Sequence, residues 1–330
     1  MNPSSASAAV DRISEPLCQP SAPNQRLRML CLQHMCNAVP SSQPMILSRA
    51  FTIALKAANA AGLADAAAPP ARKVHEIAKG IRNQPQLERD LWLAARDALA
   101  ASDTRGSELE AHSCAVRYLQ TFQGTPKTEL EQAAEVASEV VVSFLNRPNS
   151  FQADFAQLDP IRQLRNEKAH RLKHQILETF VKGTLSEMQT LLKERQLELS
   201  TSGINSEVLL RKTRLNMLVQ IAEDTMQKPM EKGFVASQLD VDSAAIDSWI
   251  ISAMGANLLD ASIDEMNGTV TFTRASPRVF GAKDWESLRG RLASWRDRLI
   301  EARSQLHTRI SEKAQTSANP LSATIAAASQ

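Results

Sequence analysis

The amino-acid sequence predicts a mainly helical protein: a helical-repeat (solenoid) array, then a winged helix, then a long C-terminal helix. Residues of high helix propensity are abundant, while nine Phe, four Trp and one Tyr are all the aromatic side chains in 330 residues. Apolar residues recur at helical spacing through most of the chain. One strong β-hairpin pattern falls between helical patterns in the last third, where the topology of a winged helix requires it.

Composition excludes several function classes. The chain is 43% hydrophobic, enough for a substantial core, and its net charge of +2 is far from that of a protein dominated by nucleic-acid binding. Only 11 glycines occur, and no two lie closer than Gly281 and Gly290. Neither a dinucleotide-binding loop nor a Walker-type phosphate loop fits this spacing, so we expect no cofactor.

The two terminal segments and the cysteines indicate the cellular compartment of the protein. Residues 1–23 and 317–330 are rich in small residues, and we expect both to be disordered tails. The first segment lacks the apolar region of a signal peptide, and no apolar run is long enough to span a membrane. The four cysteines are expected to be reduced thiols, and Cys31 and Cys36 lack a second pair for a metal site. These features predict a cytoplasmic protein without membrane contact.

Residues 24–203 show a succession of helical patterns of about 10 to 20 residues, separated by short breaks. We assign 24–110 to N-terminal helical repeats and 111–203 to the helical part of the following domain. Proline clusters at 40–44 and at 69–70 are predicted breaks. Because each pattern has one apolar face, neighbouring helices are expected to stack side by side.

Residues 204–277 carry the winged-helix pattern. A helix over about 206–226 and a short apolar stretch over 234–239 precede a helix that begins near Asp242, where Asp242 or Ser243 is a plausible N-cap. Two alternating strands follow around Leu259 and Phe272. The Asn267-Gly268 pair between them predicts a type I′ turn.

Residues 278–316 predict a long helix with a heptad seam. Its apolar positions follow spacings of 3, 4, 3, 4, 3, 4 and 4, and such a seam requires a partner helix. A helix of about 30 residues extends roughly 45 Å, too far for one winged helix to cover. We therefore expect an intersubunit bundle, with folding back on the chain's own array as the alternative. The seam consists of Trp285, Leu288, Leu292, Trp295, Leu299, Ala302, Leu306 and Ile310.

This order of elements resembles the PCI-domain proteins, and within them the family of subunit M of eukaryotic translation initiation factor 3. The resemblance covers about residues 24–313. It is carried by RYLQTF at 117–122, RKTRLNMLVQIAE at 211–223 and RVFGAKDWESLRGRLASWRDRL at 278–299. The wing sequence LLDASIDEMNGTVTF departs from the family in lacking the expected glycine and lysine before the Ile-Asp pair.

The resemblance implies a PCI domain over 111–277 and a scaffold role in translation initiation on the small ribosomal subunit. The implied partners are other initiation factor 3 subunits of PCI and MPN type, including subunits F and H, and the small ribosomal subunit through the complex. A place in the COP9 signalosome, like its subunit 7, or in the proteasome lid is the alternative.

No pattern predicts catalysis or a metal. Glu167, His170, His174 and Glu178 could line one face of a helix, but a di-metal bundle needs a second such element, and none is found. A solvated face with mixed charges is the better account. Since no hydrolase or zincin motif is present either, we expect a non-enzymatic protein with no small-molecule substrate.

Nucleic-acid binding is the competing class, because many winged helices read DNA with their third helix. That helix, over 242–256, contains Asp242 and Asp247 and no Lys or Arg, which disfavours a DNA regulator. Positive charge gathers instead in two regions. Residues 278–313 contain nine basic and five acidic residues, and residues 161–182 contain six basic and two acidic residues. Either region could be a solvated face. The candidates for a weak contact with ribosomal RNA or an acidic partner are Arg289, Arg291, Arg296 and Arg298.

Overall fold

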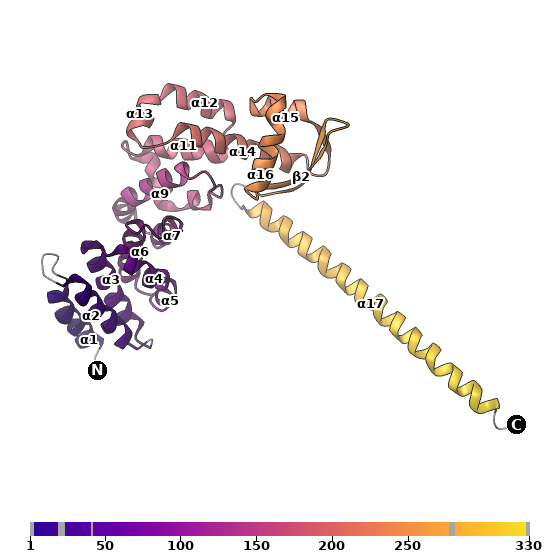
Figure 1. Cartoon of the computed structure of the whole chain (residues 1–330), viewed down its shortest axis with the longest axis horizontal. Coiled ribbons are helices and arrows are strands. Elements are labelled where there is room, and N and C mark those ends of the chain that lie inside the picture. Colours follow the sequence, from indigo (N-terminus) through magenta and orange to yellow (C-terminus); the bar gives the residue numbers. More distant parts are fainter. Residues whose placement is uncertain (1–2, 19–23, 41, 277–280, 328–330) are drawn as a thin grey trace. The chain divides into compact units, whose positions relative to one another are not determined.

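A computed structural model describes residues 3–18, 24–40, 42–276 and 281–327. The chain divides into two units, Met1–Arg278 and Val279–Gln330, and each is described by itself. The first unit contains the helical array and the winged helix, and the second contains one long helix (Figure 1). The predicted fold class is confirmed.

The first half of the array is a run of helices that pack on their neighbours (Figure 1). Helix α6 is central, because it packs against α3, α4 and α7. Its inward face is built from alanine and larger apolar residues at helical spacing, among them Leu91, Ala95 and Leu99, which are buried. The helices are α1 (Pro3–Ser14), α2 (Gln25–Ala38), α3 (Pro44–Ala60), α4 (Ala64–Arg72), α5 (Val74–Lys79), α6 (Pro85–Ala100) and α7 (Ser107–Gln120).

Helix α1 corrects the prediction that residues 1–23 form a disordered tail. Val10 is buried in a small cluster with Cys36, Ile46 and Ala50. Asp11 also pairs with Arg49 of α3, at 2.6 Å. An apolar anchor on α3 therefore orders a segment whose composition alone is typical of disorder. Residues 1–2 and 19–23 lie outside the described residues.

Helix α4 differs from the predicted break, because Pro69 and Pro70 lie inside it. Proline in a helix interior is unfavourable by about 3 kcal/mol, since it removes a backbone donor and crowds the preceding turn. Four alanines of α4 are buried, and the helix packs closely on α6. Tertiary packing therefore overrides the local signal.

The second half of the array leads into the winged helix and has shorter helices. These are α8 (Lys127–Leu130), α9 (Ala134–Asn146), α10 (Asp159–Gln163), α11 (Arg171–Lys182), α12 (Leu185–Glu194) and α13 (Gln196–Thr201). Short 3-10 turns lie between several of them, at Glu131–Ala133, Asp154–Gln157 and Leu164–Asn166, and a further one, Glu15–Leu17, follows α1. A 3-10 turn at Leu164–Asn166 and a short stretch after it thus separate α10 from α11.

The winged helix contains α14 (Ser206–Asp224), β1 (Pro229–Glu231), α15 (Lys232–Leu239), α16 (Ile246–Gly255), β2 (Leu259–Asp264) and β3 (Thr269–Ala275). A 3-10 turn, Ser243–Ala245, precedes α16, and Asp242 is its N-cap, accepting a hydrogen bond from the Ala244 N–H. The sheet is antiparallel in the order β1-β3-β2. Strand β1 has only three residues and was not predicted, and the apolar stretch 234–239 forms α15.

The hairpin turn is not of type I′. That turn needs positive φ at both central residues, but only Gly268 has it, at +62°, and Asn267 does not. Four residues separate β2 from β3 instead. The Asp264 carboxylate accepts hydrogen bonds from the backbone N–H groups of Met266 and Asn267, which holds a wider loop.

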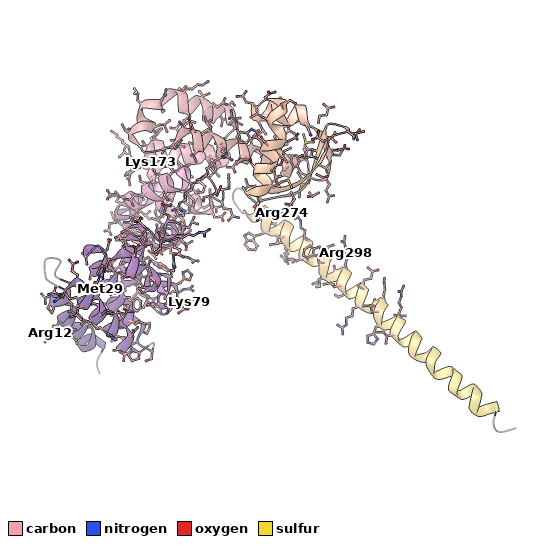
Figure 2. All side chains as sticks on the ribbon, in the orientation of Figure 1. Arg12, Met29, Lys79, Lys173, Arg274 and Arg298 are labelled. Atoms are coloured by element: carbon pink, nitrogen blue, oxygen red, sulfur yellow. The ribbon has the colours of Figure 1, made fainter. Side chains whose placement is uncertain are left out.

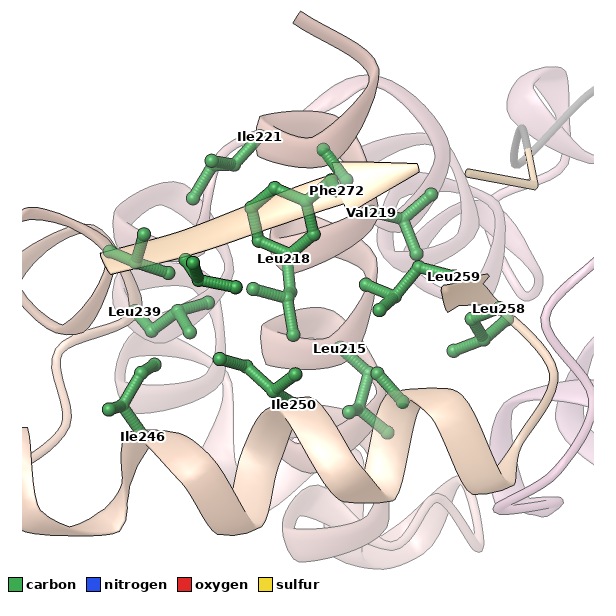
Figure 3. Packing of buried hydrophobic residues seen from close by; sticks show 14 of the residues in the cluster. Leu215, Leu218, Val219, Ile221, Leu239, Ile246, Ile250, Leu258, Leu259 and Phe272 are labelled. Atoms are coloured by element: carbon green, nitrogen blue, oxygen red, sulfur yellow. The ribbon is translucent and has the colours of Figure 1, made fainter. Parts of the chain in front are cut away.

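One apolar core unites the winged helix (Figure 3). Leu218 of α14, Ile250 of α16 and Phe272 of β3 are fully buried in it, and side chains from α15 and β2 complete it. Burial of one such side chain contributes about 1.5 to 3 kcal/mol. Because residues from its helices and strands meet in one cluster, the winged helix, including α14, packs as a single body.

The N-terminus of α14 carries a testable cap. The Asn205 side-chain oxygen accepts hydrogen bonds from the N–H groups of Glu207 and Val208, at 3.0 and 3.3 Å. We expect Asn205→Ala to lower the free energy of unfolding by about 1 kcal/mol, because it leaves these donors without the cap. Chemical denaturation of the full chain measures this. Asn205→Asp, which keeps the acceptor, is the control, and an equal loss in both variants would contradict the cap.

The second unit consists of α17 (Ala282–Ala327), a single helix of 46 residues. It continues well into 317–330, which was predicted to be a disordered tail. Pro320 lies within this stretch, so α17 continues past a residue that ordinarily interrupts a helix. Residues 328–330 lie outside the described part, as does Phe280. Among the described helices of the whole chain, none has the length and apolar character needed to span a membrane.

Candidate protein-interaction surfaces

The seam of α17 is an exposed apolar stripe. All its predicted members lie on the one helix, and those with large side chains are between 38% exposed, for Leu288, and 71% exposed, for Leu299. Trp285 and Trp295 are each more than 60% exposed. Large aromatic and aliphatic side chains that repeat along one side of a helix indicate a surface that another helix covers.

The four candidate arginines lie on the same helix and are all exposed. Arg296 pairs with its neighbour Asp297 at 3.0 Å, and both side chains are largely exposed. Exposed pairs of this kind contribute at most about 1 kcal/mol, so they hold the guanidinium only weakly. The arginines therefore remain accessible to a partner.

The third helix of the winged domain, α16, presents an apolar surface. Ile251 is 62% exposed and Met254 is 38% exposed, and Phe234 of α15 is 51% exposed. Asp247 on α16 pairs with Lys232 at 3.0 Å, and Lys232 also pairs with Glu265 at 2.8 Å. Two carboxylates thus hold the Lys232 ammonium group, and the exposed apolar side chains of this surface suit a protein partner.

The sheet of the wing has β2 as one of its edges. Strand β2 spans Leu259–Asp264 and pairs on one side only, with β3, through a register irregularity between Asp260 and Ala261. Its other side carries main-chain donors and acceptors without a strand partner in the sheet. An edge of this length is a template for an added strand.

Lys212 joins the array to the winged helix, and the sequence patterns gave no sign of it. This α14 side chain is 1% exposed. Its Nζ donates a hydrogen bond to the Phe144 carbonyl oxygen of α9, at 2.6 Å, and lies 4.0 Å from the centre of the Phe144 ring. The Phe180 and Phe151 rings are at 5.2 and 5.9 Å. Carbonyl and ring faces are both favourable to an ammonium ion.

Burial and charge shift the protonation of this region. Burial, together with the positive charge of Arg147, lowers the pKa of Lys212 to about 7. Burial also lowers the pKa of the nearby His112 to about 4, and the charges of Arg147 and Lys212 add to the effect. Arg147 has its pKa lowered by burial as well. Three basic groups therefore crowd this packing junction, and the Glu108 carboxylate partly offsets the lowering of the Arg147 pKa.

The predicted charged face of Glu167, His170, His174 and Glu178 does not form on one helix. Helix α11 begins at Arg171, so Glu167 and His170 precede it. Glu167 lies 3.8 Å from His170, while Glu178 pairs with Lys182 at 3.3 Å. The described residues contain no group of three or more side chains placed to hold a metal ion.

The four cysteines are free thiols that differ in exposure. Cys36 and Cys114 are buried, and burial raises their thiol pKa values to about 11 and about 12. Cys31, however, is exposed on α2. Cys31 and Cys36 share a helix but not an environment, because a separation of five residues turns the two side chains to different faces.

Comparison with known families matches two adjacent segments. Residues 168–274 match the PCI domain, and residues 278–301 match the family described as eIF3 subunit M, C-terminal helix. The first segment covers the winged helix and the last helices of the array. The second contains the seam from Trp285 to Leu299.

Three relatives share the same name, eukaryotic translation initiation factor 3 subunit M. That of Phaeosphaeria nodorum is 28% identical over 235 residues, 70% of this chain and 52% of the relative. That of Nematostella vectensis is 28% identical over 210 residues, which are 63% of this chain and 53% of the relative. That of Neosartorya fischeri is 30% identical over 225 residues, which are 66% of this chain and 46% of the relative. The alignments thus cover about half the length of these curated relatives.

Proposed function

We propose that this chain, which has a segment matching the PCI domain and resembles subunit M of eukaryotic translation initiation factor 3, is a non-catalytic scaffold subunit of that factor. The exposed apolar seam of α17 is the observation that carries this proposal, since part of it lies in the segment that matches the C-terminal helix of the family. In this role the protein supports assembly of the pre-initiation complex on the small ribosomal subunit, in the cytoplasm.

Three surfaces of the chain serve the assembly. The seam of α17 enters a bundle with helices of other subunits, which removes its tryptophans and leucines from water. The β2 edge and the apolar surface of α16 contact neighbouring PCI subunits, through main-chain hydrogen bonds and apolar burial respectively. The proposed partners are other subunits of the factor, of PCI and MPN type, including subunits F and H.

Arg289, Arg291, Arg296 and Arg298 are the residues of this helix suited to polyanions. They provide either a weak contact with ribosomal RNA or a contact with an acidic face of a partner subunit. Both are consistent with exposed guanidinium groups, which bind phosphates and carboxylates in the same bidentate way.

Affinity capture of the tagged full chain from eukaryotic cells tests the proposal. We expect subunits of initiation factor 3 to co-purify in near-stoichiometric amounts, as measured by quantitative mass spectrometry. Enrichment of COP9 signalosome or proteasome-lid subunits in their place would contradict the assignment. Capture of specific duplex DNA with neither set of subunits would support a winged-helix regulator instead. A chain ending at residue 276 is the control for contacts made through α17.

A further inference from the structure

The seam of α17 is flanked on both sides by arginine. With Trp285 at heptad position a, the a and d positions follow the seam to Leu306. The e positions are then Arg289, Arg296 and Arg303, and the g positions are Arg291, Arg298 and Gln305. All five arginines are exposed, and Arg298 is labelled in Figure 2. Every e and g position from Trp285 to Leu306 is therefore arginine except one.

The acidic residues of the same stretch lie elsewhere on the helix. Glu286 is at position b, Asp297 at f and Glu301 at c, so none stands beside the seam. Among the described side chains of α17, the ion pair between Arg296 and Asp297 is the one that the geometry supports. Apart from the exposed pair of Arg296 with Asp297, the border arginines form no ion pair among the described side chains, so most of the positive charge beside the seam is left for a partner.

Residues at e and g face the corresponding residues of a partner helix and decide which partner is accepted. A second copy of this chain fits poorly. In a parallel pair, Arg291 would face Arg296 of the copy and Arg298 would face Arg303. In an antiparallel pair, e would face e and g would face g, which again opposes arginine to arginine. Like charges at such positions are destabilising.

RNA satisfies only part of this surface. Phosphates could pair with the arginines and bases could stack on Trp295, but aliphatic side chains of the seam such as Leu299 would stay in water or meet a charged backbone. A helix with its own apolar seam and acidic borders covers both components at once. We therefore propose that α17 binds a helical segment of another protein whose e and g positions are acidic. This rests on the proposed bundle role and specifies the chemistry of the partner.

Two designed peptides test the charge rule on the full chain. Both are helical, with leucine at a and d and the same length, and they differ only in having Glu or Lys at every e and g position. Fluorescence anisotropy measures their binding at low and at high salt. We expect at least about tenfold tighter binding of the Glu peptide at low salt, because five weak charge pairs add up, and a smaller difference at high salt.

A charge-reversed chain provides the matched variant. Arg289→Glu, Arg291→Glu, Arg296→Glu, Arg298→Glu and Arg303→Glu together are expected to reverse the preference, so that the Lys peptide binds about tenfold tighter. Far-UV circular dichroism checks that helix content is retained. In addition, the wild-type chain is expected to sediment as a monomer at micromolar concentration.

Several outcomes would overturn the inference. The first is equal binding of the two peptides, and the second is dimerisation of the wild-type chain through the seam. The third is tighter binding of a single-stranded RNA probe than of the Glu peptide, together with weaker binding of that RNA to the charge-reversed chain. The proposed function fails differently: the Glu peptide would still be preferred, but capture from cells would enrich the subunits of another complex.

Discussion

Lys212→Ala is expected to lower the free energy of unfolding by about 3 kcal/mol, because it opens a cavity among three phenylalanine rings in a closed interior. The variant also removes the hydrogen bond from Nζ to the Phe144 carbonyl oxygen, which keeps the Arg147 N–H as a donor at 3.3 Å. Chemical denaturation followed by far-UV circular dichroism measures the loss. An unchanged midpoint would show that the junction does not hold the array to the winged helix.

Lys212→Met is the matched control, because it keeps most of the volume and removes the charge. We expect it to be far less destabilising than Lys212→Ala at neutral pH, since an apolar group of similar shape avoids the desolvation of an ammonium ion. If both variants lost the same stability, the cost would come from the missing ammonium contacts rather than from the cavity.

Comparison of the wild type with Lys212→Met gives a pH test with a definite sign. The pKa of Lys212 is about 7 in the folded protein and ordinarily 10.5. Between these values the unfolded chain binds more protons, so the lysine contributes stability that rises with pH. We expect the wild type to gain stability relative to Lys212→Met between about pH 7 and pH 10.5. A constant difference across this window would contradict the lowered pKa.

Replacing Leu292, Trp295 and Leu299 together by Asp is expected to release the protein from its complex. Each side chain is more than half exposed in the isolated chain and contributes about 1.5 to 3 kcal/mol when buried by a partner. The combined loss exceeds a hundredfold in affinity, even when the cost of ordering the interface is deducted. Affinity capture with quantitative mass spectrometry measures it, and retention of partners at wild-type levels would contradict the bundle.

The control adds the same charge away from the seam. Ser294, Ser304 and Thr308 are exposed on α17 at positions outside a, d, e and g, and their replacement by Asp is expected to leave capture nearly unchanged. If the control released the partners as well, the negative charge of the helix, and not its apolar seam, would be responsible. Circular dichroism of both purified variants separates either result from loss of the fold.

The sequence predicted the elements whose signal is local. The seam could be placed residue by residue, because a heptad pattern is contained in one helix, and the wing strands could be placed by alternation. The arginines beside the seam were found for the same reason. Where local signals competed with packing, the prediction failed: prolines marked a break within α4, and the composition of residues 1–23 hid a helix whose Val10 docks on its neighbours.

The sequence by itself therefore determined the order of array, winged helix and terminal helix, and the apolar face of α17. These features follow from periodicity within single elements. Only the tertiary structure decided that three-residue β1 completes the sheet, that Asp247 and Glu265 hold Lys232, and that Lys212 lies among phenylalanines from other segments. Each depends on contacts between residues far apart in the chain, and no local spacing encodes such contacts.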